Sequence, residues 1–459
     1  MKKIYYKLTF LSDIVLQGSS NTLGKVETLD YITGSSILGI VAKNYDKFEN
    51  PIDIFHSKKV RFGEATLLSE NKECYKAPLC FFAPKEDFDK QEVKNNHFID
   101  YKNQEELDKQ YKQIRTGYIN SNLDYLNLDF TYTQKAAYDK KNRKSEDGKM
   151  YGYNSIQKGT SWIFSLKIDD TINQNDKKLL EDSLVGVRYL GKSKSSSYGK
   201  VKIEELKDYK LENIENPITT GVNYIYVKSS LALFDENGMS TFIPTKESLA
   251  LENAKIVWEE TQIKTKTFTP YNSIRECFDF SRNIIQRGSV IALKNISPKD
   301  IETLKKGIGA YLNEGYGEVL INPSFLLKED KFCLNKKDIV YEKIENETSK
   351  IDDDLVAFLN NKSEISKKTL TLVEEVEKYI EENKNSFKGV SKSQWGQIRA
   401  YTQFHKESYR EKIKDFISHG ISEKQWKDAK EKLEKLLDEK SLEFIKLFSM
   451  TMPKKDLEK

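Results

Sequence analysis

The chain has 459 residues, about three times the roughly 150 residues of an average domain, so a single small module is excluded and two or three domains are expected. Hydrophobic residues make up 38% of the chain and aromatic residues 11%, which is enough core material to exclude a disordered protein. Lys and Arg number 75 and Asp and Glu 71, a net charge of +4. Any affinity for nucleic acid must therefore come from local patches.

Targeting, membrane and metal signals are weak throughout the chain. The first ten residues alternate polar and apolar like a strand and lack the apolar core of a signal peptide. No stretch approaches the roughly 20 consecutive apolar residues of a membrane span. The four cysteines and four histidines lack the spacing of a zinc site or an HExxH pair. We expect a cytoplasmic protein with no membrane partner, disulfide framework, metal or cofactor.

The first 205 residues predict an α+β domain. Apolar residues alternate along Ile4–Phe10 as in a half-buried strand, and Gly34–Ser36 precedes an apolar helical segment. A further strand is predicted over Val60–Leu68. Residues 85–130 are polar and rich in Lys and Asn, which indicates an insertion or a long loop.

The order of the later elements suggests a weak internal repeat. The first unit ends with a strand at Trp162–Ile168, a helix near 174–185 and a Gly-bounded loop. After a spacer, a second strand-rich unit begins at Val222, contains a helix at 299–306, and ends in a Gly-rich loop and the strand Val319–Ile321. Each unit thus ends as helix, Gly-bearing loop and strand. This order predicts two ferredoxin-like domains, over residues 1–205 and 221–345.

The composition changes near residue 350. Of the 22 glycines 19 precede residue 351, and Pro453 is the only proline after it. Leu372, Val376 and Ile380 recur at helical spacing, as do Trp426, Leu433 and Leu437. Residues 351–459 are therefore predicted to form a helical region.

The first Gly-rich loop, residues 191–200, combines lysines, hydroxyls and one aromatic ring between two glycines. Lysines neutralise phosphates, hydroxyls donate to phosphate oxygens and a tyrosine can stack on a base. An ordinary solvated turn is the alternative, and composition does not separate the two. The candidate RNA-binding residues of this loop are Lys192, Lys194, Ser195, Ser196, Ser197, Tyr198 and Gly199.

The second Gly-rich loop, residues 307–317, has paired glycines at both ends. Glycine permits positive φ and close approach of the backbone to a ligand. The loop is not a dinucleotide fingerprint, because Leu312 stands where GxGxxG needs its third glycine. A tight helix-to-strand connection is the alternative. The candidate binding residues here are Gly307, Gly309, Gly315, Tyr316 and Gly317.

Basic and aromatic residues interleave between residues 271 and 288. Arg275, Arg282 and Arg287 are candidate RNA contacts, while Phe278 and Phe280 suit a core equally well.

Several short motifs occur in a fixed order along the chain. They lie at residues 29–39 (LDYITGSSILG), 61–65 (RFGEA), 77–85 (APLCFFAPK), 137–139 (AYD), 149–156 (KMYGYNSI) and 391–396 (SKSQWG), together with the two Gly-rich loops and the Gly288-Ser289 turn. This series resembles the RAMP superfamily of CRISPR-associated proteins, and more narrowly the type III-D subunit that holds the 5′ handle of the guide RNA. One departure is Ile32-Thr33-Gly34, where relatives often have Ile-Pro-Gly.

The resemblance implies paired ferredoxin-like domains and a guide RNA (crRNA) ligand. It also implies that backbone RAMP subunits and the large polymerase/cyclase subunit are neighbours and that other subunits cleave the target. The protein is then a non-catalytic RNA-binding subunit in antiviral defence. Lys192, Lys194 and residues 195–197 would contact handle phosphates, and Tyr198 and Tyr316 could stack on bases.

Two other functions remain open. The first is a metal-independent RAMP endoribonuclease that processes repeat RNA with His56 or His97 as general base. The second is a protein-only scaffold, in which the basic loops are plain turns.

Overall fold

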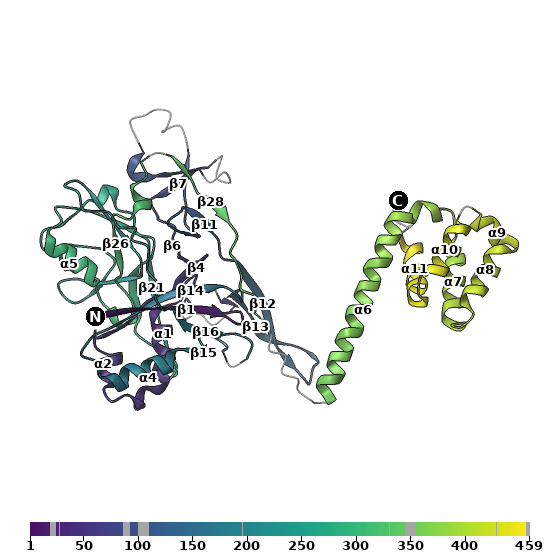
Figure 1. The fold of residues 1–459 in the computed structure, drawn as a ribbon, viewed down its shortest axis with the longest axis horizontal. Helices are drawn as coiled ribbons and strands as arrows, with labels where there is room; N and C mark the ends of the chain where they lie inside the picture. The colour runs from purple at the N-terminus through teal and green to yellow at the C-terminus, as the bar shows by residue number, and fades with distance from the viewer. Residues whose placement is uncertain are drawn as a thin grey trace. The chain divides into compact units, whose positions relative to one another are not determined.

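The computed structural model describes residues 1–18, 24–26, 28–85, 92–99, 110–194, 196–329, 331–344, 354–427 and 429–455. The chain forms two compact units, Met1–Glu345 and Asn346–Lys459. Strands dominate the first unit and helices the second (Figure 1). The mixed α+β class with a helical C-terminal region is confirmed. None of the described helices is long and apolar enough to cross a membrane.

The largest sheet is built around the first strand of the chain. Its strands are β1 (Lys2–Phe10), β3 (Val60–Phe62), β4 (Thr66–Ser69), β5 (Lys72–Glu73), β14 (Ser161–Ile168), β15 (Gly186–Tyr189) and β16 (Lys200–Glu205). They lie in the order β15-β16-β1-β14-β4-β5, and β3 also pairs with β14. Helices α1 (Gly34–Val41) and α4 (Gln174–Leu184) pack side by side and contribute to the core beneath this sheet (Figure 1).

Strand β1 is central because it pairs with β14 on one side and β16 on the other. Tyr6, Leu8 and Phe10 are buried on the face toward the helices. The predicted strand Val60–Leu68 is divided into β3 and β4, because the two pair with β14 in registers that differ by one residue: Phe62 pairs with Leu166 and Thr66 with Ile163. The Gly63 N–H donates to the Ser165 carbonyl of β14 at 2.9 Å, and a Cβ at Gly63 would lie 2.7 Å from that oxygen, so this position needs glycine.

A second sheet repeats the strand order of the first. Its strands are β17 (Asn223–Val227), β20 (Lys255–Ile256), β25 (Val290–Lys294) and β26 (Val319–Ile321), and α5 (Pro298–Lys306) precedes β26. Its spatial order is β20-β25-β17-β26. In both sheets the first strand therefore lies beside the last: β1 lies between β16 and β14, and β17 lies between β26 and β25. Between β17 and β20 the described chain forms β18 (Leu231–Phe234), β19 (Ser240–Thr241) and turns, where the first sheet has α1.

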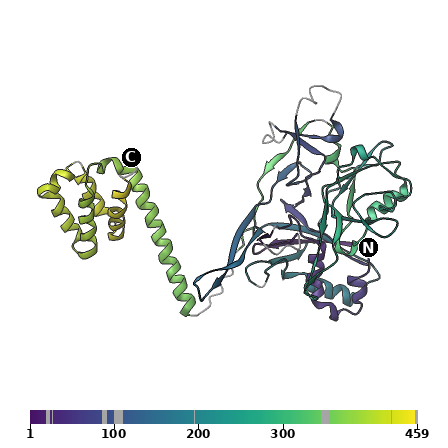
Figure 2. The ribbon, with the colours of Figure 1, turned by 180° about the vertical axis from the view of Figure 1, so that it is seen from behind.

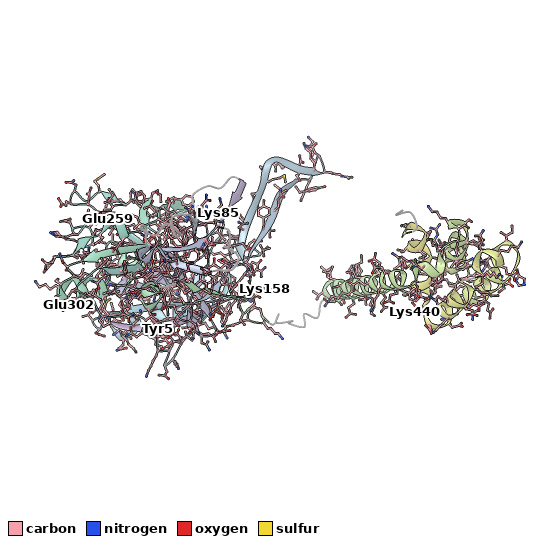
Figure 3. All side chains as sticks on the ribbon, turned by 90° about the horizontal axis from the view of Figure 1, so that it is seen from above. Tyr5, Lys85, Lys158, Glu259, Glu302 and Lys440 are labelled. Atoms are coloured by element: carbon pink, nitrogen blue, oxygen red, sulfur yellow. The ribbon has the colours of Figure 1, made fainter. Side chains whose placement is uncertain are left out.

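A long hairpin lies within the segment that joins β4 to β14. It consists of β12 (Phe130–Asp139) and β13 (Lys144–Ile156), and it reaches out from the rest of its unit (Figures 2 and 3). Side chains along β12 alternate between exposed and half-buried, whereas Tyr153, Ser155 and Ile156 at the end of β13 are buried. The sequence did not predict this ribbon.

Short strands complete the first unit. They are β2 (Gly24–Val26), β6 (Tyr75–Lys76), β7 (Phe81–Pro84), β8 (Glu92–Asn95), β9 (Tyr111–Gln113), β10 (Tyr118–Ile119), β11 (Asp124–Leu126), β21 (Thr265–Phe268), β22 (Tyr271–Asn272), β23 (Cys277–Phe278), β24 (Arg282–Ile285), β27 (Phe332–Cys333) and β28 (Asn335–Lys337). The short helix α2 (Pro51–Phe55) lies between α1 and β3 in sequence. The predicted insertion at 85–130 includes β8 to β11, and its residues 86–91 and 100–109 lie outside the described ranges.

The C-terminal unit is a helical bundle with its own core. Its helices are α6 (Asp354–Asn383), α7 (Lys392–Phe404), α8 (Tyr409–Ser418), α9 (Gly420–Trp426), α10 (Lys430–Glu439) and α11 (Leu442–Lys455). Trp395, Trp426, Phe387 and Phe448 are fully buried within it. The predicted apolar series from Leu372 to Ile380 lies on α6, and the series from Trp426 to Leu437 is divided between α9 and α10.

Candidate nucleic-acid interface

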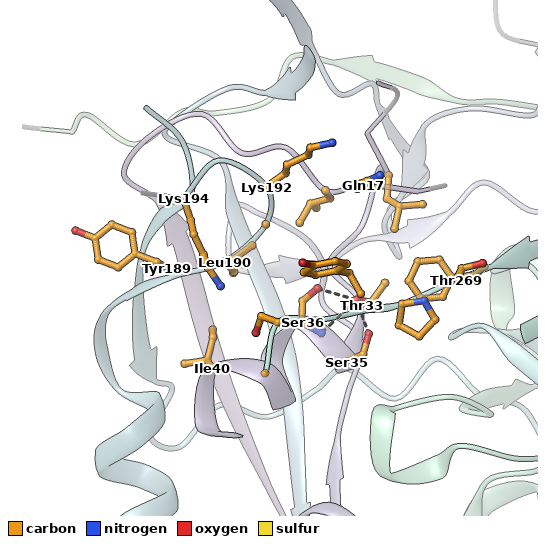
Figure 4. A pocket seen from close by; sticks show the side chains of 18 of the residues that line it. Gln17, Thr33, Ser35, Ser36, Ile40, Tyr189, Leu190, Lys192, Lys194 and Thr269 are labelled. Carbon is orange, nitrogen blue, oxygen red and sulfur yellow. Dashed lines mark hydrogen bonds between the residues drawn. The ribbon is translucent and has the colours of Figure 1, made fainter. Parts of the chain in front are cut away.

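Segments far apart in sequence line a pocket of about 570 Å³ (Figure 4). Most of the lining comes from α1 and the residues before it, from the first Gly-rich loop with the end of β15, and from the strand-turn segment 268–278, and residues 16–17 complete it. The lining residues are Leu16, Gln17, Leu29, Thr33, Ser35, Ser36, Gly39, Ile40, Tyr189, Leu190, Gly191, Lys192, Ser193, Lys194, Phe268, Thr269, Pro270, Tyr271, Ser273 and Phe278. This set contains lysines, hydroxyls and aromatic rings but no carboxylate.

Hydroxyl groups cluster where α1 begins. Thr33 is the N-cap residue, and its Oγ1 accepts a hydrogen bond from the Ser36 N–H at 3.3 Å. Ser35 Oγ donates to Thr33 Oγ1 at 3.0 Å, and the hydroxyls of Thr33 and Ser36 are 2.8 Å apart (Figure 4). The N-terminal end of a helix carries partial positive charge. This wall of the pocket therefore favours an anion.

The first Gly-rich loop supplies the cations of the pocket. Gly191 has φ +82° and a Cβ there would lie 2.5 Å from the Val15 carbonyl, while the Lys192 N–H donates to that carbonyl at 2.9 Å. The loop is thus fixed against the segment after β1. Lys192 Nζ lies 5.5 Å from the centre of the Tyr153 ring. Burial, and then the charge of Lys43, lower the pKa of Lys194.

Aromatic and apolar side chains form the side of the pocket opposite the lysines. Tyr271 and Phe278 face each other across the β22–β23 hairpin, with ring centres 5.3 Å apart. Phe268 and Pro270 line the pocket beside them. Arg275 lies at the tip of the hairpin, where its guanidinium is 3.2 Å from the Asp279 carboxylate. Such a surface can receive the flat face of a base.

The second Gly-rich loop approaches the protein's own backbone. A Cβ at Gly315 would lie 2.3 Å from the Phe62 carbonyl, and one at Gly34 would lie 2.0 Å from the Glu314 carbonyl. Gly307, Gly309, Gly315 and Gly317 all have φ between +76° and +95°. The close approach that these glycines permit is thus intramolecular. It supports the start of α1 from behind.

Three of the candidate side chains around this loop are buried in protein contacts. Arg282 makes a two-pronged ion pair with Glu314, with one N–O distance of 2.7 Å, and its guanidinium lies 4.0 Å from the centre of the Tyr311 ring. Arg287 donates to the Ala65 and Lys228 carbonyls at 3.1 and 3.2 Å. Tyr316 is 3% exposed, which leaves its ring no free face. Arg282, Arg287 and Tyr316 are therefore not part of the RNA-binding site that we propose.

The remaining candidates divide between two sides of the first loop. Lys192 and Lys194 line the pocket, whereas Ser196 and Ser197 line a neighbouring groove. Tyr198 is 7% exposed and packs against Tyr153, with Lys135 Nζ 4.8 Å from its ring centre, and Gly199 is buried beside it. Ser195 lies outside the described residues. The RNA contacts assigned to these residues stay predictions.

Sequence reasoning missed the hydroxyls of Thr33, Ser35 and Ser36 as pocket residues. The available signal was a hydroxyl-rich segment at the start of a helix, a place where anions bind. It also missed Tyr189, because only the fold brings the end of β15 to the pocket.

The two candidate general bases lie away from the pocket lining. His56 Nε2 is 3.2 Å from the Tyr45 hydroxyl. His97 Nε2 is 2.8 Å from the Glu260 carbonyl and 2.7 Å from Gln262 Oε1, its ring stacks on Tyr224 at 4.2 Å, and burial lowers its pKa. Within the described ranges, no group of three or more His, Cys, Asp or Glu residues is arranged to hold a metal ion.

Solved structures similar to this chain are CRISPR RAMP proteins, the superfamily that the sequence motifs resemble. One belongs to the type III-B Cmr-beta complex bound to cognate target RNA and AMPPnP, at 11% identity and a TM-score of 0.41 over 70% of this chain and 99% of that chain. Another belongs to the Csm3-Csm4 subcomplex of the type III-A interference complex, at 14% identity and a TM-score of 0.31 over 69% and 98%. A third is a RAMP protein binding different RNA substrates, at 9% identity and a TM-score of 0.28 over 70% and 98%.

No family model and no curated protein matches the sequence. All three TM-scores lie below 0.5. We therefore build the proposed function on the residues and contacts of this chain.

Proposed function

We propose that this chain is a non-catalytic RNA-binding subunit of a type III CRISPR effector complex, resembling the type III-D subunit that holds the 5′ handle of the crRNA. The single observation that carries the RNA-binding role is the pocket of about 570 Å³, which joins two lysines, a hydroxyl-lined helix start and aromatic rings without any lining carboxylate. Because two lysines and no carboxylate line it, a pocket of this size favours an anionic ligand.

The fold supports the same superfamily. In both large sheets the first strand lies beside the last, which supports the β-α-β-β-α-β order of a ferredoxin-like domain, and strands and turns follow β17 where α1 follows β1. We infer two RAMP domains, at residues 1–205 and 221–345. The series of short motifs along the chain supports the assignment to a CRISPR-associated protein.

In this proposal, the pocket binds one end of a single strand by its phosphates and a base. Lys192 and Lys194 neutralise phosphate oxygens, and the hydroxyls of Ser35 and Ser36 donate to them. The base lies against Tyr271 and Phe278, whose rings accept any base by stacking.

We propose the crRNA handle as the ligand, with backbone RAMP subunits and the large polymerase/cyclase subunit as neighbours. The helical unit serves as a docking surface for them. Tagged protein purified from its host in mild salt identifies the ligand when the RNA that accompanies it is sequenced. We expect enrichment of guide RNAs that share one repeat-derived 5′ end, and an intact complex without such RNA would overturn the proposal.

The pocket itself is tested with the double variant Lys192→Ala/Lys194→Ala. Losing two phosphate contacts should weaken binding of a repeat-derived RNA and reduce the slope of log affinity against log salt by about 1.4, since each single-strand contact contributes about 0.7. Lys246→Ala/Lys299→Ala is the matched control, because it removes the same charge at exposed lysines that pair with Glu247 and Glu252. If the Lys192→Ala/Lys194→Ala variant and the control had equal salt slopes, the RNA would bind at a site other than the pocket.

The same reactions test the absence of catalysis. We expect repeat RNA to remain intact with and without EDTA. Cleavage in EDTA that is lost in His56→Ala or His97→Ala would instead establish the endoribonuclease.

A further inference from the structure

A second groove lies on the other side of the first Gly-rich loop. Its volume is about 540 Å³, and it is lined by Ser12, Lys43, Tyr189, Lys194, Ser196, Ser197, Tyr198 and Lys200. Tyr189 and Lys194 line both this groove and the pocket. The two hollows are therefore neighbours, with these two side chains at their common border. We call this second hollow the cationic groove.

The charge of the cationic groove is uncompensated. Lys43, Lys194 and Lys200 line it, and no carboxylate does. Among the residues that the structure describes, no Asp or Glu oxygen lies within 4.0 Å of these three ammonium groups, whereas exposed lysines such as Lys202 have a carboxylate partner at 2.8 Å. Burial lowers the pKa of Lys194, and the charge of Lys43 lowers it further. Crowded like charges without a counter-ion favour a bound polyanion.

The other lining groups suit a nucleic-acid strand. Ser12, Ser196 and Ser197 carry hydroxyls that can donate to phosphate oxygens, and Ser196 and Ser197 are exposed. Tyr189 is 41% exposed at the border of the two hollows, so its ring is free to stack on a base.

We propose that a single RNA strand continues from the pocket across Tyr189 and Lys194 into the cationic groove, where Lys43 and Lys200 bind its next phosphates. This inference rests on the proposed function, because it assumes that the pocket holds one end of that strand. It adds a second binding site and three residues, Lys43, Tyr189 and Lys200. The ligand is a flexible single strand long enough to cover both hollows, since a duplex cannot bend around one loop.

The test measures binding of 5′-labelled oligouridines of 2 to 12 nucleotides to the full-length protein. Wild-type affinity should rise with length as the strand reaches the groove. Lys43→Ala/Lys200→Ala should bind the shortest oligomers like wild type, lose about tenfold in affinity for the longest, and reduce the salt slope there by about 1.4. Tyr189→Ala should also lose about tenfold for the longest oligomers, and Tyr189→Phe should restore it because stacking needs only the ring.

The variants separate this inference from the proposed function. Suppose that Lys43→Ala/Lys200→Ala has the same affinity as the Lys246→Ala/Lys299→Ala control at every oligomer length, while Lys192→Ala/Lys194→Ala binds weakly. The pocket then binds RNA as proposed, and the inference about the groove is wrong. If neither pair weakens binding, both are wrong. Should the alanine pair be poorly folded by circular dichroism, Lys43→Gln/Lys200→Gln removes the same charges with polar side chains, and the same criteria apply.

Discussion

Arg282 fixes the second Gly-rich loop from inside the protein. Its guanidinium forms a two-pronged pair with Glu314 and lies over the ring of Tyr311, a residue whose φ of +57° is uncommon outside glycine. Both partners of the ion pair are largely buried. The pair therefore holds a strained turn, and through Gly34 it also holds the start of α1 at the pocket.

The first prediction concerns this pair. Arg282→Met should lower the free energy of unfolding by about 3–5 kcal/mol, because it leaves the Glu314 carboxylate buried without its partner. Adding Glu314→Leu should recover part of that loss, since the unpaired charge is then removed. Urea unfolding of the single and double variants measures both effects. A loss below about 1 kcal/mol in the single variant would show that water reaches Glu314.

Glu64 carries a second prediction at the residue scale. It lies in the RFGEA motif, accepts a hydrogen bond from the Ser230 N–H at 3.0 Å, and sits 3.9 Å from Arg287. Burial raises the pKa of Glu64 from 4.5 to about 7, against the attraction of Arg287. The folded state thus binds this proton more tightly than the unfolded state, so its contribution to stability is present at acid pH and is lost as the pH rises toward 7.

We expect wild type to lose about 2–3 kcal/mol relative to Glu64→Gln when the pH rises from 5 to 8. Urea unfolding at several pH values measures this difference, and the glutamine variant cancels the titration of all other groups. Parallel pH profiles for the two proteins would mean that Arg287 holds the Glu64 carboxylate ionised throughout.

At the element scale, α5 shows how a local signal sets a boundary. Ser297 Oγ accepts from the Asp300 N–H at 3.2 Å, and the Asp300 carboxylate accepts from the Ser297 N–H at 2.9 Å, which closes a capping box. Ser297→Ala should destabilise the protein by about 1 kcal/mol. Lys299→Ala, at the exposed second residue of α5, is the control and should cost less than about 0.5 kcal/mol. Thermal unfolding compares the two variants. If their unfolding midpoints were equal, the capping box would contribute nothing and packing alone would stabilise α5.

Such local signals explain which elements the sequence predicts well. The helices expected near 174–185 and at 299–306 occur at Gln174–Leu184 and Pro298–Lys306, because Asn173 and Ser297 cap them. The β12–β13 ribbon was not predicted, since β12 has no buried apolar face and its aromatic residues Phe130, Tyr132 and Tyr138 are exposed.

The site was predictable only in part, for a related reason. Lys192 and Lys194 stand out by composition, but the pocket also needs α1 and the segment 268–278, which only long-range packing brings to them. Both Gly-rich loops were candidates in the sequence. The structure separates them by exposure: the first is open on two sides, and the glycines of the second face protein backbone.

At the scale of the whole molecule, the two units have separate cores. Every buried cluster of the first unit lies within residues 6–339, and that of the helical unit lies within residues 376–452. Trp395 is at the centre of the helical core: it is fully buried, and its ring lies 4.9 Å from Trp426, 5.3 Å from Phe448 and 5.6 Å from Phe387. Damage there should therefore be confined to the helical unit.

Trp395→Ala makes this separation measurable in the full-length protein. The cavity should cost the helical unit about 3–5 kcal/mol, which lowers its thermal transition and reduces helical circular dichroism. RNA affinity and its salt slope should equal those of wild type, because the pocket and the cationic groove belong to the strand-rich unit. The variant should instead recover fewer neighbouring subunits when purified from its host, since the proposed docking surface is lost. A tenfold fall in affinity for short oligouridines would show that the helical unit contributes directly to RNA binding. If the variant recovered as many neighbouring subunits as wild type, the helical unit would not be their docking surface.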